Sequence, residues 1–172
     1  MPPRVVLVGL PGTGKSTVGA ELARRLEVAF ADSDELVAQQ AGRSVAEIFQ
    51  HQGEPVFRQL EADMIAEALG GFDGVLALGG GAVTTESVRQ DLRGSGVPVV
   101  LLTAAQEELL ARLGGTESRP LLAGDAPARL AELAEAREPL YREVASLTVP
   151  TGGRSPAEVA ATLHEQLIGQ PS

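Results

Sequence analysis

The chain lacks cysteine and tryptophan and has one tyrosine and four phenylalanines among its 172 residues. Without cysteine it can form neither disulfides nor thiolate metal sites. Because 44% of the residues are hydrophobic but only 3% aromatic, the core has to consist of Leu, Val, Ile and Ala, in a chain long enough for one domain. No window approaches the roughly eighteen apolar residues of a membrane span, and the first apolar run is too short for a signal sequence. We therefore expect a soluble, cytoplasmic protein.

Positive charge is also scarce. Fourteen Lys and Arg residues face 23 Asp and Glu, which gives a net charge of −9. This balance argues against a nucleic-acid partner, because a phosphate backbone requires a basic surface. An anionic substrate would have to be bound by local arginines rather than attracted by a general field.

Lysine occurs once, at Lys15, in the segment Gly9-Leu-Pro-Gly-Thr-Gly-Lys-Ser-Thr17. This segment matches the Walker A pattern G-x-x-x-x-G-K-[ST], in which the lysine binds between phosphate oxygens where a planar guanidinium fits badly. The apolar run 5–8 before it predicts a buried strand, and the apolar spacing in 15–26 predicts a helix. Main-chain N–H groups at that helix start can bind an anion, and the Ser16 hydroxyl can bind Mg²⁺. The segment therefore predicts a site for a nucleoside triphosphate. A Rossmann dinucleotide site is disfavoured, because Thr17 stands where that fingerprint has glycine.

Strand and helix patterns alternate along the rest of the chain. We expect strands at 5–8, 28–31, 75–78, 98–102 and 147–149 and helices at 15–26, 33–40, 45–50, 56–69, 86–92, 106–113, 127–145 and 155–168. The last helix has a strong start, with Ser155 at the N-cap, Pro156 at the first position and Glu158 at the third. This alternation predicts an α/β fold whose parallel sheet is covered by helices on both faces.

Two aspartates, Asp32 and Asp34, flank Ser33 at the end of the second predicted strand. Ligands of doubly wound sheets gather at the carboxyl ends of the strands, so both carboxylates should lie near the phosphate loop. One could assist Mg²⁺, and the other could accept or orient a substrate hydroxyl. The alternative is helix capping, which one aspartate or Ser33 could perform. Two aspartates exceed what capping needs.

The triple glycine 79–81 follows the third strand and is consistent either with close approach of the backbone to a ligand or with a tight turn. Arg58 and Arg137 lie in predicted helices, and each alone could be a solvated surface arginine. Glu61, three residues after Arg58, could hold it by an ion pair. Two arginines facing one site could bind a carboxylate in bidentate geometry.

The segment 113–126 is rich in glycine, lacks apolar periodicity and carries Arg119. It predicts either a mobile lid that brings Arg119 to the phosphates or an ordinary surface loop.

Taken together, these segments resemble the shikimate kinase family nearly end to end. The resemblance rests on GLPGTGKST, DSD at 32–34, GRSVAEIF, GEPVFR, LGGGAV, SRPLL and AREPLY, in that order. The phosphate loop is common to many kinases, whereas GE-x-x-FR, GGGAV and RPLL are far more specific. The resemblance implies the nucleoside-monophosphate-kinase type of P-loop fold, with a five-stranded parallel sheet and a lid. It also implies transfer of the ATP γ-phosphoryl group to the 3-hydroxyl of shikimate, a step of chorismate and aromatic amino acid biosynthesis.

The resemblance also implies roles for individual residues. The ATP phosphates would be bound by Gly12, Thr13, Gly14, Lys15, Ser16 and Thr17. The adenine base of ATP would lie near Arg154, with Arg112 on its other side. Ser16 would bind one Mg²⁺, and Asp32 would hold it through water. Asp34 would bind the shikimate hydroxyls and act as the base, with Lys15 and the lid residue Arg119 as its catalytic partners on the phosphates. Shikimate would further contact Arg58, Arg137, the Gly80 backbone, Phe49 and Phe57. The chain departs from the family pattern at Glu138, whose charge could weaken the carboxylate site.

Three other functions compete with this interpretation. A gluconate-type kinase of the same fold would also use arginines for a carboxylate. An adenylate kinase is less consistent with the sequence, because that family usually has G-K-G-T where this chain has Gly14-Lys15-Ser16-Thr17. A non-catalytic ATP-binding module would have no use for Asp34, Arg58, Arg119 and Arg137. We expect one domain over 1–172, with a substrate-binding region at about 33–61, and nothing in the sequence demands more than a monomer.

Overall fold

The computed structural model describes residues 1–113 and 126–168. Within them, the chain forms one parallel sheet of five strands in the order β2-β3-β1-β4-β5. The strands are β1 (Val5–Val8), β2 (Ala29–Asp32), β3 (Gly74–Ala77), β4 (Val99–Thr103) and β5 (Leu147–Pro150). The five predicted strands are confirmed, with ends that differ by at most one residue.

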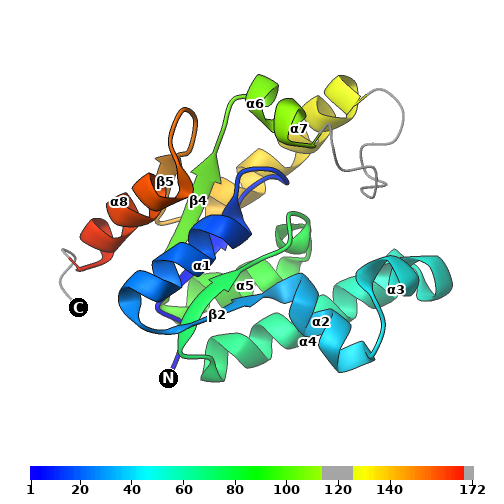
Figure 1. Ribbon diagram of the computed structural model, residues 1–172. Coiled ribbons are helices and arrows are strands. Elements are labelled where there is room, and N and C mark those ends of the chain that lie inside the picture. The colour runs from blue at the N-terminus through cyan, green and yellow to red at the C-terminus, as the bar shows by residue number, and fades with distance from the viewer. Residues whose placement is uncertain (114–125, 169–172) are drawn as a thin grey trace.

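Helices connect the strands, as Figure 1 shows. They are α1 (Lys15–Leu26), α2 (Ser33–Ala41), α3 (Val45–Gln52), α4 (Glu54–Gly71), α5 (Glu86–Ser95), α6 (Gln106–Leu113), α7 (Ala126–Val144) and α8 (Pro156–Ile168), with a 3₁₀ turn at Ala82–Thr84. We expected α4 to begin at Val56, but it begins at Glu54 and has Pro55 in its first turn. A proline is tolerated there, because N–H groups in the first turn have no partner within the helix. The predicted start of α8 is confirmed: the Ser155 hydroxyl accepts from the Glu158 N–H (3.1 Å) and the Glu158 carboxylate accepts from the Ser155 N–H (3.3 Å).

The core is aliphatic and lies on both faces of the sheet. Alternate residues of β1 point to opposite sides, so that Val5 and Leu7 belong to one cluster and Val6 and Val8 to the other. The first cluster includes residues of α1 and α8, and the second includes residues of α4, α5 and α7. Burial of both faces explains why the central strand reads as a continuous apolar run.

A third, small cluster joins α2, α3 and the first half of α4, around the buried residues Val37, Ile48 and Phe57. In Figure 1 these helices extend to one side of the sheet. This cluster lies within the predicted substrate-binding region of 33–61, so that region has a hydrophobic cluster of its own, separate from the main core.

The arrangement of strands determines where a ligand can bind. The central strand β1 lies between β3 and β4, so connections at its carboxyl end run to both sides of the sheet. A crevice for ligands forms at such a point in open α/β sheets. Segment 9–14 leaves the sheet there, and so do Asp32 and the triple glycine. None of the helices in the described ranges is long and apolar enough to cross a bilayer.

Candidate active site

The phosphate loop joins β1 to α1 and depends on glycine geometry. Gly12 and Gly14 have φ values of 88° and 89°, in the left-handed region that favours glycine. A Cβ atom on Gly9 would lie 2.6 Å from the carbonyl oxygen of Leu102. Gly14 is the N-cap of α1 and provides no side-chain cap, so the first N–H groups of this helix are open to an anion.

Lys15 is the first residue of α1, and its ammonium group turns back over the loop. Its Nζ donates to the carbonyl oxygens of Gly9 (2.8 Å) and Leu10 (3.0 Å). The side chain therefore lies across the loop that would surround the phosphates. Thr13 is 1% exposed and donates to the Leu10 carbonyl (2.9 Å), so its side chain stabilises the loop, and any contact with a phosphate would come from its main chain.

The predicted metal ligands lie together. The Ser16 hydroxyl donates to Asp32 Oδ2 at 2.8 Å, and Asp32 Oδ1 accepts from the Asp34 N–H at 2.8 Å. Asp32 therefore caps α2 and also faces the phosphate loop. Hydroxyl and carboxylate oxygens suit Mg²⁺, which takes few protein ligands and completes its shell with water and phosphate oxygens. Within the described part of the chain, no group of three or more His, Cys, Asp or Glu residues could hold a metal ion.

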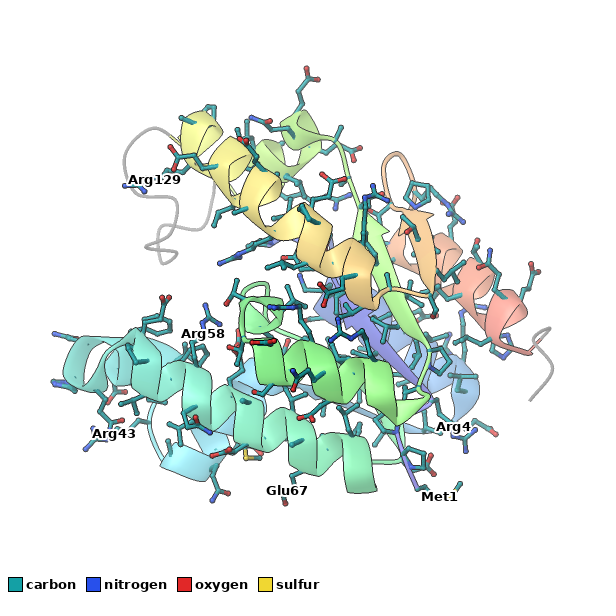
Figure 2. The ribbon with its side chains drawn as sticks, turned by 180° about the vertical axis from the view of Figure 1, so that it is seen from behind. Met1, Arg4, Arg43, Arg58, Glu67 and Arg129 are labelled. Atoms are coloured by element: carbon teal, nitrogen blue, oxygen red, sulfur yellow. The ribbon has the colours of Figure 1, made fainter. Side chains whose placement is uncertain are left out.

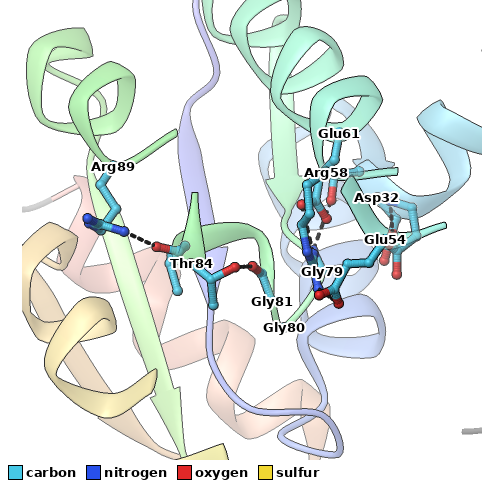
Figure 3. Close-up of polar contacts among 12 residues, drawn as sticks. Asp32, Glu54, Arg58, Glu61, Gly79, Gly80, Gly81, Thr84 and Arg89 are labelled. Carbon is cyan, nitrogen blue, oxygen red and sulfur yellow. Dashed lines mark hydrogen bonds and ion pairs between the residues drawn. The ribbon is translucent and has the colours of Figure 1, made fainter. Parts of the chain in front are cut away.

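The triple glycine lies against three of the predicted acceptor residues, one for each glycine. A Cβ atom added to Gly79 would lie 2.6 Å from Asp34 Oδ1, and one on Gly80 would lie 3.3 Å from Arg137 Nη1. A Cβ atom on Gly81 would lie 2.3 Å from Arg58 Nη2. A side chain at any of these three positions would therefore crowd one of the predicted acceptor residues. Figure 3 shows this turn beside Arg58, which Figure 2 shows on the side of α4 that faces α7.

The two arginines differ in their surroundings. The predicted pair of Arg58 and Glu61 is confirmed, with Nη1 2.9 Å from Oε1, and Glu54 adds a longer contact of 3.7 Å. Arg137 is 5% exposed, and its Nη1 has no hydrogen-bond partner among the residues that the structure describes. A buried guanidinium nitrogen without an acceptor is costly unless a ligand supplies one. The site therefore fits an anion.

Glu61 is the most perturbed carboxyl of this region. Burial raises its pKa to about 7, and the nearby Asp34 charge acts in the same direction, while Arg58 and Arg137 oppose the shift. Its side chain is fully buried, and Oε2 has no partner within the described residues. Glu61 can therefore change its charge in the neutral pH range.

The two predicted wall residues lie in the third cluster. The rings of Phe49 and Phe57 are 4.7 Å apart, and the Arg58 guanidinium lies 5.2 Å from the centre of the Phe57 ring. Phe57 is 3% exposed. The Phe57 ring is therefore almost fully covered, and it packs against Phe49 and Arg58.

On the other side of the phosphate loop lies a cavity of about 230 Å³, where the resemblance would place the adenine base of ATP. Its lining includes Gly14, Thr17, Arg112 and Arg154. Arg112 donates to the Gly12 carbonyl oxygen (2.8 Å), while Arg154 is held by Thr162 and the Glu158 carbonyl oxygen. Both arginines that the resemblance places near the adenine of ATP therefore line one cavity.

Some expectations need correction or fall outside the described residues. Glu138 accepts from Arg142, one turn further along α7 (3.2 and 2.8 Å), so an arginine partly balances the charge that we expected to weaken the carboxylate site. Of the expected lid at about 113–126, the structure describes Leu113 as the last residue of α6 and Ala126 as the first residue of α7. Arg119 and the rest of that segment lie outside the described residues.

Two residues contact this site in ways that the sequence did not predict. Ser33 is fully buried and accepts from the Gly79 N–H at 2.9 Å, and Tyr141 is 2% exposed and donates to the Gly80 carbonyl at 2.6 Å. Tyr141 could have been singled out as the only tyrosine, four residues after Arg137 on the same helix face.

Comparison with known proteins agrees with this geometry. The family model "SKI: Shikimate kinase" matches residues 11–168. The shikimate kinase of Rhodococcus jostii is 45% identical over 97% of this chain and 99% of its own length, and that of Mycobacterium tuberculosis is 46% identical over 100% and 98%. Among solved structures, shikimate kinase from Acinetobacter baumannii in complex with shikimate has a TM-score of 0.91 at 36% identity, covering 98% of this chain and 93% of that one. A gluconokinase from Sinorhizobium meliloti has a TM-score of 0.62 at 21% identity, covering 99% and 98%, and shows a common fold alone. The chain belongs to the shikimate kinase family.

Proposed function

We propose that this chain transfers the γ-phosphoryl group of ATP to the 3-hydroxyl of shikimate, giving shikimate 3-phosphate and ADP. Membership of the shikimate kinase family supports this assignment. The structural observation that carries it is the placement of Asp34, Arg137 and Arg58 against Gly79, Gly80 and Gly81 in turn. These groups match a small molecule with both a carboxylate and a hydroxyl.

The division of labour follows from the geometry. The two guanidiniums and the glycine turn bind the shikimate carboxylate, and the Asp34 carboxylate orients the hydroxyl. The hydroxyl oxygen forms a bond to the γ-phosphorus while the bond from that phosphorus to the β,γ-bridging oxygen breaks. The hydroxyl proton passes to Asp34, and ADP leaves with the bridging oxygen.

Lys15 and the N–H groups of the phosphate loop stabilise the charge on the polyphosphate. We assign the same task to Arg119, on the basis of the family resemblance. One Mg²⁺ would be held by Ser16 and, through water, by Asp32, and it would neutralise phosphate charge. The Ser16–Asp32 contact of 2.8 Å brings these two oxygen ligands together at the edge of the loop.

We infer further that residues 1–172 act as one kinase domain, as a monomer in the cytoplasm. The third hydrophobic cluster supports a distinct substrate-binding region at about 33–61. The net charge of −9 supports small-molecule partners rather than nucleic acid or an anionic membrane surface.

One panel of assays tests the function. ADP release from Mg-ATP is measured with shikimate, gluconate, AMP or no acceptor. We expect rapid ADP release only when shikimate is the acceptor. NMR should identify the product as shikimate phosphorylated on its 3-hydroxyl. Faster turnover with gluconate would favour a sugar-acid kinase, and nucleotide binding without turnover on any acceptor would favour a non-catalytic module.

A further inference from the structure

In the turn Gly79–Gly81 all three carbonyl groups accept hydrogen bonds, whereas only one of the three amides donates one to a described residue. Each carbonyl has a donor: Gly79 accepts from the Ala82 N–H (3.1 Å), Gly80 from the Tyr141 hydroxyl (2.6 Å) and Gly81 from the Thr84 N–H (3.1 Å). Within the described part of the chain, the N–H groups of Gly80 and Gly81 have no acceptor. A turn with occupied carbonyls and open amides suits an anionic ligand.

The Tyr141 bond differs from the other two because it reaches the turn from a distant helix. Tyr141 lies on α7, 61 residues from Gly80 in the chain, whereas Ala82 and Thr84 lie within three residues of their acceptors. Tyr141 is also one helical turn after Arg137, so both side chains lie on the same face of α7. One helix thus delivers a guanidinium and a hydroxyl to the same glycine.

Peptide geometry explains what this bond controls. The Gly80 carbonyl and the Gly81 N–H belong to one planar trans peptide, in which they point in opposite directions. Glycines allow such a peptide a wide range of rotation, because no Cβ restricts their dihedral angles. Fixing the Gly80 carbonyl therefore fixes the direction of the open Gly81 N–H.

We propose that Tyr141 is a positioning residue for the acceptor substrate: its hydroxyl holds the Gly80–Gly81 peptide so that the open amide and the adjacent guanidiniums form one site for the carboxylate. This inference rests on the proposed function, since it names how the acceptor is bound. Tyr141 touches no reacting atom and acts through the turn.

The hydroxyl is suited to this role over a wide pH range. Burial raises the pKa of Tyr141 to about 12, against the opposing effects of the Arg137 charge, a side-chain hydrogen bond with Arg137 and the Arg58 charge. The phenol therefore keeps the proton that it donates to Gly80 at any pH at which the enzyme would work.

The variant Tyr141→Phe keeps the ring and removes only the hydroxyl. We expect the KM for shikimate to rise about three- to tenfold, as for the loss of one hydrogen bond, while the KM for ATP stays within about twofold. The matched control is Ser146→Ala, which removes a hydroxyl that donates to the carbonyl of Val99 (3.2 Å), the first residue of β4. Ser146→Ala should leave both KM values unchanged.

A purely structural role for Tyr141 would lower the melting temperature of Tyr141→Phe and leave the shikimate KM at the wild-type value, and that result would overturn the inference. Failure of the wild type to phosphorylate shikimate would instead overturn the proposed function. A second measurement needs no variant, because the chain has one tyrosine and no tryptophan. Titration with shikimate should change the tyrosine fluorescence with a midpoint at the shikimate Kd. If Tyr141→Phe does not fold, fluorescence that stays constant to saturation contradicts the inference.

Discussion

The guanidinium of Arg58 lies 2.9 Å from the carboxylate of Glu61, one turn further along α4, and the Glu61 side chain has no exposed surface. Arg58 itself also contacts the Phe57 ring and the Gly81 backbone. A buried carboxylate thus fixes an arginine whose other side faces the substrate region. The ion pair between Arg58 and Glu61 requires the charged form of Glu61.

The first prediction concerns this charge. The pKa of Glu61 is about 7, so lowering the pH from about 8 to about 6 protonates it and weakens its hold on Arg58. We expect the Kd for shikimate, measured by calorimetry without nucleotide, to rise about three- to tenfold over this range, as for the loss of one charge-assisted hydrogen bond. Glu61→Gln should bind weakly and with little pH dependence. A wild-type Kd that is constant over this range would contradict the prediction.

As the pH rises, shikimate should bind more tightly, but the free energy of unfolding should fall. Because the pKa of Glu61 is higher in the folded protein than its ordinary value of 4.5, the folded state binds the proton more tightly. The stabilisation from this group is fully present below about pH 4.5 and is lost as the pH rises to about 7. Urea unfolding of the wild type should therefore show a decline over this window that is absent in Glu61→Gln.

Asp34 is the carboxylate that lies against Gly79. Because it is the proposed proton acceptor, Asp34→Asn should lower kcat by about a hundredfold or more. The Kd for ADP should stay near the wild-type value, because the phosphate loop is unchanged. Near-normal turnover in this variant would remove Asp34 from the catalytic step.

The ammonium group of Lys15 lies across the phosphate loop and donates to two carbonyl oxygens of that loop. A guanidinium is planar and broader than an ammonium, so Lys15→Arg should lose most of its activity although the charge is kept. Steady-state assays would measure this loss, with the melting temperature as a check on folding. An active Lys15→Arg enzyme would contradict the argument that the phosphate loop requires an ammonium.

Gly81 tests the close approach of Arg58. An alanine Cβ there would lie 2.3 Å from Arg58 Nη2, although the φ of −96° itself allows alanine. Because the obstructed atom is the end of a flexible side chain, Gly81→Ala should displace Arg58 and raise the shikimate KM about tenfold while changing stability little.

The matched control is Gly94→Ala in α5, where a Cβ atom would meet nothing within 4 Å. It should leave the KM unchanged and stabilise the protein by about 0.5–1 kcal/mol through helix propensity. Equal KM values for the two variants would show that Gly81 need not be glycine.

The sequence alone determined the elements of this fold and the phosphate loop, because both depend on local patterns. Buried parallel strands require continuous apolar runs such as 5–8, and a phosphate loop requires glycines and one lysine at fixed spacing. The Arg58–Glu61 pair was also predictable, since its partners are one helical turn apart. For each of these features, the interacting groups are close in the chain.

Tertiary structure decided how distant groups meet. The contact of Tyr141 with Gly80 spans 61 residues, and that of Arg112 with Gly12 spans 100. Neither contact could be predicted from a spacing in the sequence, because both depend on how helices pack over the carboxyl ends of strands. The same packing buries Glu61 and raises its pKa. Glu138 instead pairs with Arg142, one helical turn further along α7. Local patterns specify which groups are available, and the packing of helices on the sheet determines which of them share a site.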